Sequence, residues 1–396
     1  MKLKNYQHIY KNQYFYLYLL GLVILIFLLI FRLGNLVGGM SQSEIIASKT
    51  SYGWHGIYNS VIYLPLKVLR SIDFKLFKDH GQTLTRLPNI VFGFLSVISF
   101  SYIVYIWHGK RTSLLSTFLF LTAAWTMHVS RLASYDIMFF WGIVSLLLTQ
   151  VILSEYSQSR LASLFSYFIW GLLLTIPGFI YLLLIFFILE KDLIKDSWDE
   201  VKSIWVRVLS IVLLILWLPL LIKSLAHLSN LKYYLGFPNK LPSLTHYLKD
   251  FVGVFVHLFI RGPEYPYIWL GKSPILDFFV LILSILGIFF YFKHFNSNRA
   301  KLLFYLFIAG YILISFAGAV PLSLLVPLMY IFSATGMAYL LYIWFKVFPK
   351  NPLARKLAIS LISIAVIFSC IYNLRAYFVA WKLDPTTRAT FNQHLK

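Results

Sequence analysis

Acidic residues are scarce in this chain of 396 residues, which has 14 Asp and Glu against 35 Lys and Arg. Charged residues of both signs make up only 12% of the sequence, whereas a soluble domain has roughly 25%. This composition excludes an ordinary soluble protein. It also singles out each carboxylate, because an acid near a bilayer is costly unless it is solvated, paired or used.

Cysteine and the common sequence motifs are nearly absent as well. The single Cys370 lies in a hydrophobic run, so a disulfide framework and a Cys-x-x-Cys metal site are excluded. There is no Walker A loop, no GxGxxG with a following acid and no HExxH. No internal repeat is evident, which weakens the case for an inverted-repeat transporter. The net charge of +21 does not indicate nucleic acid, because most cations flank hydrophobic runs, where lipid headgroups and topology explain them.

Long hydrophobic runs are what the sequence has in abundance. Hydrophobic residues make up 60% of the chain, and several runs approach the roughly 20 residues that cross a bilayer core. They predict an all-α polytopic membrane protein with about 11 transmembrane helices. The short fifth and sixth runs form either a tight hairpin or one broken helix. The predicted spans are 14–34, 87–107, 113–130, 136–154, 161–175, 177–190, 204–223, 274–292, 301–319, 321–346 and 356–378.

Lys and Arg in the short loops predict the orientation, because they favour the cytoplasmic side. The first run lacks a small-residue cleavage site, so we expect it to be a retained span. We therefore predict a multi-pass protein of the cell membrane, with a cytoplasmic N-terminus and an extracytoplasmic C-terminus. Residues 1–396 are predicted to form one membrane domain without a soluble C-terminal domain. The cytoplasmic cations are Lys2, Lys4, Lys11, Lys110, Arg111, Lys293, Arg299, Lys301, Lys346, Lys350, Arg355 and Lys356.

Two long segments, 37–86 and 225–273, are then extracytoplasmic, and long loops in compact membrane proteins usually have a function. Residues 58–72 of the first segment are apolar with Lys67 and Arg70 on a polar side, which is typical of a helix in the membrane interface. The second segment is rich in aromatics and includes Arg261 and Lys272. This pattern suits a phosphorylated lipid headgroup, or an ordinary aromatic belt with positive anchors.

Two acidic spots fall on this outer side: Glu44 in residues 41–44, and Asp136 at the end of residues 130–136. If the two loops fold together, one carboxylate can take a proton from an acceptor hydroxyl. The other can orient the acceptor or hold a divalent metal. Arg131 can bind a leaving phosphate or pair with a carboxylate. Alternatively, Arg131 and Asp136 only anchor and cap a helix.

Five short elements follow one another along the chain. They are residues 40–44, residues 58–66 with Leu64-Pro65-Leu66, Arg86-Leu87-Pro88, Gly109-Lys110-Arg111, and the set Ser130, Arg131, Ala133 and Asp136. Their order resembles the C-type glycosyltransferases that use polyprenyl-phosphate sugars, such as the protein mannosyltransferases and the lipid A aminoarabinose transferases. Two features depart from that pattern: Ser43 stands where the family often has its first, catalytic Asp, and the Pro-Pro pair of the interfacial helix is missing.

The resemblance implies transfer of a sugar from a polyprenyl-phosphate donor to a glycan, lipid or protein acceptor outside the cytoplasm, among membrane lipids. It makes Glu44 the expected base and Asp136 its helper, with no certain cofactor beyond a possible divalent metal at these two acids. The expected substrate-binding residues are Arg131, Arg261, Lys272, His55, Tyr58 and Asn59.

Three other functions stay open at this point. One is a transporter or flippase for a lipid-linked sugar, which should carry intramembrane charges along a path. Another is a catalytically degenerate relative that binds polyprenyl lipid, which Ser43 favours. The third is a polymerase or ligase of surface polysaccharide.

Overall fold

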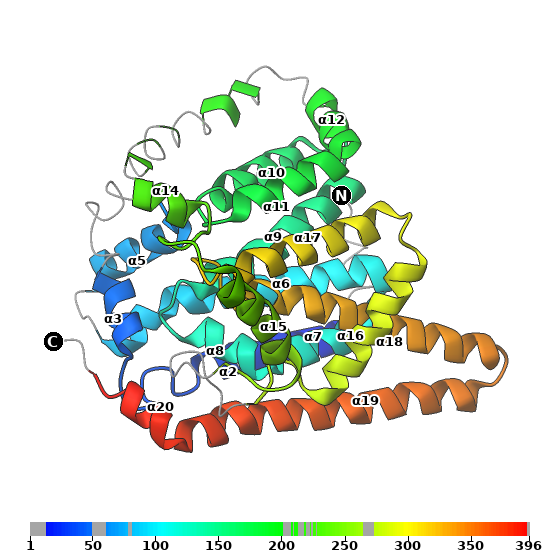
Figure 1. Ribbon diagram of the computed structural model, residues 1–396. Coiled ribbons are helices and arrows are strands. Elements are labelled where there is room, and N and C mark those ends of the chain that lie inside the picture. The colour runs from blue at the N-terminus through cyan, green and yellow to red at the C-terminus, as the bar shows by residue number, and fades with distance from the viewer. Residues whose placement is uncertain are drawn as a thin grey trace.

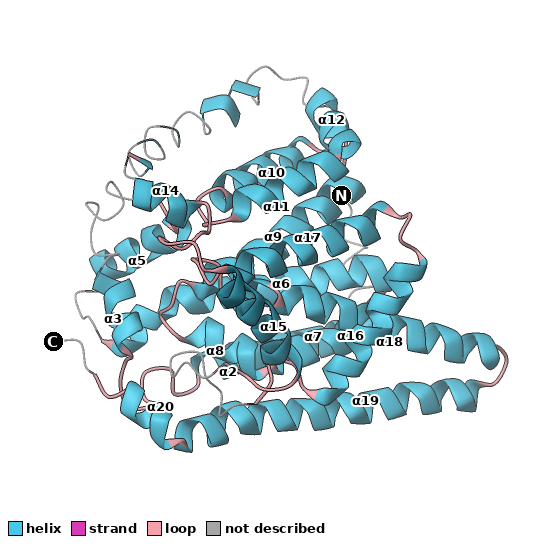
Figure 2. Cartoon of the chain, viewed as in Figure 1, coloured by secondary structure: helices cyan, strands magenta, loops and turns pink. Residues whose placement is uncertain are grey.

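The computed structural model describes residues 13–49, 61–77, 81–200, 228–263 and 273–393, and a few residues between 207 and 226. These parts of the chain form a helical bundle whose only β-type pairing is an isolated bridge (Figures 1 and 2). The elements in chain order are α2 (Gln13–Ile30), α3 (Gln42–Lys49), α5 (Leu64–Leu76), α6 (Gln82–His108), α7 (Lys110–Thr122), α8 (Ala124–Arg131), α9 (Asp136–Glu155), α10 (Arg160–Leu173), α11 (Phe179–Leu189), α12 (Lys191–Glu200), α14 (Leu228–Tyr234), α15 (Leu244–Phe259), α16 (Phe278–Lys293), α17 (Asn298–Ser315), η2 (Leu322–Leu324), α18 (Val326–Val347), α19 (Pro352–Arg375), η3 (Ala376–Trp381) and α20 (Pro385–Thr390).

The all-α membrane architecture predicted from the hydrophobic runs is confirmed. Among the described residues, five helices are long and apolar enough to cross a membrane, or six if the bent pair of α7 and α8 is one span. Four shorter apolar helices accompany them. Every predicted run except 204–223, most of which lies outside the described residues, coincides with a helix or helix pair. The count of 11 spans stays a prediction.

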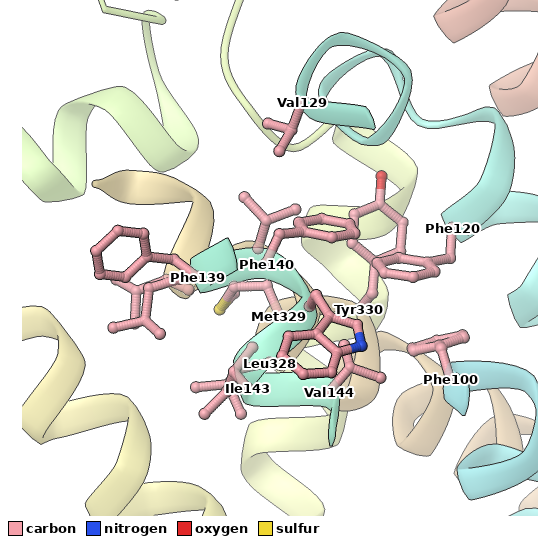
Figure 3. Packing of buried hydrophobic residues seen from close by; sticks show 14 of the residues in the cluster. Phe100, Phe120, Val129, Phe139, Phe140, Ile143, Val144, Leu328, Met329 and Tyr330 are labelled. Carbon is pink, nitrogen blue, oxygen red and sulfur yellow. The ribbon is translucent and has the colours of Figure 1, made fainter. Parts of the chain in front are cut away.

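Helices α9 and α18 form the centre of the bundle. In an apolar stretch of 18 residues from each span, 78% of the residues of α9 and 83% of those of α18 are buried, against 22% for the peripheral α19. Phe120 of α7 stacks on Phe100 of α6 at 4.2 Å and on Phe140 of α9 at 5.2 Å between ring centroids, and Tyr330 of α18 meets it edge-on (Figure 3). These aromatic contacts join four helices into one core.

Helices α16 and α18 pack backbone to backbone through two glycines. A Cβ atom built on Gly287 would lie 1.8 Å from the Phe332 carbonyl oxygen, and one on Gly336 would lie 1.9 Å from the Leu283 carbonyl oxygen. Small residues allow this close approach, which drives helix association where lipid offers no hydrophobic effect.

The bundle contains a broken helix and a hairpin. Helices α7 and α8 bend by 59° at Ala123, and the Ala124 N–H freed by the break donates to the Asn373 side chain at 3.3 Å. The short runs at 161–175 and 177–190 form a hairpin, because Trp170 of α10 contacts Phe186 and Phe187 of α11. Gly178 supplies the positive φ of 74° in its turn.

The cationic turns and the acidic motifs lie at opposite ends of the bundle. The turns that join α6 to α7, α16 to α17 and α18 to α19 gather at one end, and α3, α5 and α20 lie at the other (Figure 1). Arg299 stacks over the Trp107 ring at 4.5 Å, which brings two of these turns together. Helix α3 carries Glu44, and the Ala133 N–H in the loop before α9 bonds Glu44, so the two acidic motifs share an end of the molecule.

We expect cysteines introduced at Lys110 and Lys350 to react only with reagents that reach the cytoplasm, and cysteines at Ser43 and Lys382 only with reagents that reach the outside. The reason is the preference of Lys and Arg in short loops for the cytoplasmic side. Cysteine-accessibility labelling in intact cells, in a Cys370→Ala background, measures this. Outside labelling at position 110 would reverse the orientation and contradict the prediction.

Candidate active site

The first acidic motif begins a helix. The Glu44 backbone N–H donates to Ser41 Oγ at 3.3 Å, and the Ser41 N–H donates to Glu44 Oε2 at 3.0 Å. This reciprocal pair is a capping box, which satisfies two donors at the start of α3. The Ser-x-x-Glu spacing is therefore first of all a helix-start signal.

Glu44 is also the buried anion of an ion pair with Arg86, and its side chain is only 1% exposed. Arg86 Nε donates to Oε1 at 2.9 Å and Nη2 to Oε2 at 3.0 Å. Oε1 accepts a further bond from the Ala133 N–H at 2.9 Å. Arg86 uses its remaining donors on the carbonyl oxygens of Leu33 and Gly39, both at 2.9 Å. One charge pair thus ties together α3, α6, the loop before α3 and the loop before α9.

This arrangement does not suit Glu44 as the proton acceptor. Burial by itself would raise the pKa of the Glu44 carboxyl, but the Arg86 guanidinium and the N–H donors of Ala133 and Ser41 together hold that pKa below its usual value. Each oxygen already accepts two hydrogen bonds, so neither has a lone pair directed at a substrate. The geometry instead indicates a positioning role, which departs from the role expected from the sequence.

Asp136 belongs to the second acidic motif, and it is bonded through its backbone oxygen instead of its carboxylate. The two acidic motifs do fold together, since Ala133 donates to Glu44 and the Tyr135 hydroxyl donates to the Ala47 carbonyl oxygen of α3 at 3.1 Å. Asp136 is the first residue of α9, and Ser323 of η2 donates to its backbone oxygen at 3.2 Å. Its half-buried carboxylate has no hydrogen-bond or ion-pair partner within the described ranges. Of the two acids, Asp136 is therefore the one whose carboxylate oxygens are not already bonded within the described ranges.

Tyrosines surround this carboxylate. Tyr63 stacks on Tyr135 at 4.4 Å between ring centroids, and its hydroxyl is 2.9 Å from that of Tyr233 in α14. Burial raises the pKa of Tyr63 well above its usual value, and the nearby Tyr233 and the Asp136 charge raise it further. The phenols thus remain neutral hydrogen-bonding groups next to Asp136.

Helix α5 presents its polar face inward. Lys67, Arg70, Ser71 and Asp73 are buried, whereas the apolar Ile72 and Leu76 are 44% and 70% exposed. The sequence pattern predicted an amphipathic interfacial helix in this region, with Lys67 and Arg70 on its polar side. In the structure that polar side faces protein, because other elements supply partners. The apolar side faces outward, as expected of a helix that lies against lipid.

Two of these inward residues are the cations Lys67 and Arg70, and Arg70 contacts Tyr135, the residue before Asp136. Arg70 donates to the Ala47 carbonyl oxygen at 2.9 Å and to Asn89 Oδ1 at 3.1 Å, and its guanidinium lies 5.3 Å from the Tyr135 ring centroid. Lys67 and Arg70 are three residues apart in α5 and therefore share a face, and Tyr63 immediately precedes this helix. Burial first, and the Arg70 charge second, lower the pKa of Lys67 to about 8.

Arg131 lies on another side of the ion pair. It is 2% exposed, its Nη2 donates to the Phe31 carbonyl oxygen, and its guanidinium stacks over Tyr377 and Phe378 at 5.3 and 4.9 Å. It makes no ion pair with Asp136, although the sequence left that pairing open. Its Nε and Nη1 have no acceptor among the described residues.

Of the other predicted binding residues, the structure describes only Arg261. Arg261 is exposed just beyond α15. His55, Tyr58, Asn59 and Lys272 lie outside the described residues. Within the described ranges no three His, Cys, Asp or Glu side chains are grouped to hold a metal ion, and the filled oxygens of Glu44 do not fit a ligand role.

Sequence reasoning missed part of this site. Arg86 was noted only within Arg86-Leu87-Pro88, and Tyr63 and Tyr233 were not singled out. The Ser-x-x-Glu spacing could have revealed the capping box. The sequence pattern indicated a common polar side for Lys67 and Arg70, but nothing in the sequence showed that this side points inward.

Comparison with known proteins identifies the fold. No family model matches the sequence, and no curated protein does. Among solved structures, ArnT from Cupriavidus metallidurans in the apo state is similar with a TM-score of 0.53 at 13% identity, over 95% of this chain and 76% of ArnT. ArnT bound to undecaprenyl phosphate gives 0.54 at 13% identity, over 94% and 76%.

An oligosaccharyltransferase from Archaeoglobus fulgidus, tethered to an acceptor peptide, is similar with a TM-score of 0.55 at 13% identity. The match covers 96% of this chain and 56% of that protein, so this chain spans little more than half of its length. Both proteins are C-type glycosyltransferases. The structural similarity and the order of the sequence motifs indicate the same fold. This chain has the fold of the C-type glycosyltransferases.

Proposed function

We propose that this protein is an integral membrane glycosyltransferase that moves a sugar from a polyprenyl-phosphate donor to an acceptor hydroxyl at the extracytoplasmic face. The observation that carries the proposal is the Asp136 carboxylate, which has no ion-pair partner among the described residues and follows Tyr135, whose ring the α5 cation Arg70 contacts, within a C-type fold. Similar folds that hold undecaprenyl phosphate or an acceptor peptide support a lipid-linked donor and a separate acceptor.

In the proposed reaction Asp136 takes the proton of the acceptor hydroxyl as its oxygen attacks the anomeric carbon. The bond between that carbon and the phosphate oxygen breaks, and its electron pair leaves with the polyprenyl phosphate. A direct displacement of this kind inverts the anomeric centre. Lys67 and Arg70 stabilise the charge that develops on the phosphate, and the hydroxyls of Tyr63 and Tyr233 orient the sugar. Glu44 and Arg86 position the Asp136 loop without touching substrate.

Arg131, Arg261 and Lys272 remain proposed contacts to the donor, and His55, Tyr58 and Asn59 to the substrate. The divalent metal also remains a proposal. Addition of a chelator to the transfer assay tests it, since a metal-dependent enzyme loses turnover and regains it when the ion is restored.

The defining experiment incubates purified protein with radiolabelled polyprenyl-phosphate sugars and measures release of polyprenyl phosphate together with label in an acceptor fraction. Release that depends on acceptor supports transfer. Movement of intact donor across vesicle membranes without release would indicate a flippase instead.

A second candidate function is favoured by a specific observation. Ser43 is exposed at the position where related proteins often have an acid, and Glu44 is fully bonded. A relative that binds polyprenyl lipid without turning it over would have this geometry too. Saturable donor binding with no release across a panel of donors and acceptors would support that function.

Donor affinity should fall as the pH rises through about 8, because Lys67, whose pKa burial and Arg70 lower to about 8, then loses its charge. The free energy of unfolding should change in the opposite sense. Between about 8 and the ordinary pKa of 10.5 the unfolded chain binds more protons, so stability rises with pH in this window. Donor binding and thermal unfolding from pH 7 to 10 measure both trends.

The Lys67→Gln variant should lose both trends and bind donor about tenfold or more weakly, as expected for a lost charge-assisted contact. Lys75→Gln is the matched control, because Lys75 is exposed on the same helix. Equal donor affinity in wild type and Lys67→Gln would remove Lys67 from the site.

A further inference from the structure

A basic groove lies where the C-terminal segment meets the loop after α2. The backbones of Met40 and Gln393 exchange hydrogen bonds of 2.8 and 3.2 Å, and α20 lies beside this loop (Figure 1). Two adjoining cavities of about 510 and 530 Å³ share Asn35. We call them together the C-terminal groove. Its polar lining includes Arg32, Asn35, Thr83, Lys382, Arg388 and Asn392.

The groove carries three positive charges without a balancing acid. Arg32, Lys382 and Arg388 have no ion-pair partner in the part of the chain that the structure describes. Asp384 is the acid nearest in sequence, and its Oδ1 caps α20 by accepting from the N–H and hydroxyl of Thr386. Helix α20, which carries Arg388, and the loop after α2, which carries Arg32, lie at the end opposite the cationic turns (Figure 1), so the positive-inside preference does not account for these cations.

Arg131 adds a fourth charge behind the groove. It bonds the carbonyl oxygen of Phe31, the residue before Arg32, while its Nε and Nη1 are buried without an acceptor among the described residues. The Trp381 Nε1 donor is likewise buried and unpaired, and its ring packs on Phe391 of the groove wall at 5.4 Å.

Apolar side chains border the groove on the outer surface. Phe27 and Ile30 of α2 are 59% and 55% exposed, and Val379 and Leu383 are 47% and 54% exposed. Phe31 and Phe378 touch at 6.0 Å between ring centroids, so these two apolar edges adjoin. The groove thus combines cations with a surface suited to acyl chains, which is the pattern of the boundary between headgroups and hydrocarbon.

We infer that the C-terminal groove binds the phosphate of an anionic phospholipid headgroup, with the acyl chains along α2 and η3. Asp136 is not among the residues that line the groove, and the Glu44–Arg86 pair stands between the two loops, since Arg86 bonds the groove loop at Leu33 and Gly39 while Glu44 bonds Ala133. Its lining includes no carboxylate. It therefore has no candidate base of its own, and we assign it binding without transfer.

The test compares binding of dioleoylphosphatidylglycerol and dioleoylphosphatidylcholine to the full-length protein by native mass spectrometry and by the shift in unfolding temperature. Wild type should bind the anionic lipid in preference. The Lys382→Gln/Arg388→Gln variant should bind it roughly 30-fold more weakly, because each cation near anionic lipid contributes roughly fivefold. Lys191→Gln/Lys195→Gln in α12 is the control with the same charge change, in a helix that also has Asp192 and Asp196.

Four outcomes would overturn the inference. The first is an affinity for the anionic lipid that is the same in wild type, in the Lys382→Gln/Arg388→Gln variant and in a second variant, Arg32→Gln. The second is equal binding of phosphatidylcholine. The third is complete displacement of the lipid by millimolar inorganic phosphate, which would indicate a site for free phosphate. If the groove variant loses undecaprenyl phosphate and keeps phosphatidylglycerol, the groove is a donor site and the assignment is wrong.

Discussion

Asp136→Asn is expected to lower the rate of sugar transfer by about 10²- to 10⁴-fold, the usual contribution of a positioned general base. Asn keeps the shape of the side chain but cannot accept the acceptor's proton. Donor affinity should change little, because the lost interaction is made mainly in the transition state. Single-turnover transfer and equilibrium donor binding, measured on the same preparation, separate the two effects.

Asp196→Asn is the matched control, since Asp196 is an exposed acid of α12 and should keep wild-type turnover. Transfer by Asp136→Asn at the wild-type rate would show that Asp136 is not the base. If wild type turns over no donor at all, the lipid-binding alternative gains support. Absence of lipid binding at the C-terminal groove would leave this outcome unchanged, because none of the residues that line the groove takes part in the proposed reaction.

Arg86→Ala is expected to lower the free energy of unfolding by about 3–5 kcal/mol, because it leaves the Glu44 carboxylate buried without its partner. It also leaves the carbonyl oxygens of Leu33 and Gly39 without the donor that joins them to α6. Equilibrium unfolding in mixed micelles measures the loss. Arg86→Lys should recover only part of it, since Lys lacks the planar fork that bonds both carboxylate oxygens.

Removing both charges should cost less than removing Arg86 alone. The double variant Glu44→Gln/Arg86→Met tests this coupling, and Glu155→Gln at the exposed end of α9 is the control. Glu44→Gln should reduce stability and turnover together if Glu44 only positions the Asp136 loop. Wild-type stability combined with a large loss of turnover would restore Glu44 as the base expected from the sequence.

The general architecture could be predicted because hydrophobic runs are local. Crossing a bilayer requires a long apolar helix that satisfies its own backbone, so α6, α9 and α19 could be placed from composition alone. The order of the short motifs was also enough to indicate the C-type fold. Even the helix start at Ser41 and Glu44 is a local signal, because the capping box spans four residues.

What only the tertiary structure decided is which charges are neutralised. Glu44 meets Arg86, 42 residues away, and that contact neutralises the acid that the sequence predicted as the base. The inward direction of Arg70 depends on partners from α3 and α6, and the C-terminal groove depends on the pairing of Met40 with Gln393. The sequence determined that this chain lies in a membrane and has two acidic motifs at one end. The structure decided that Asp136 is the unpaired acid, because burial of a charge depends on donors that other helices bring to it.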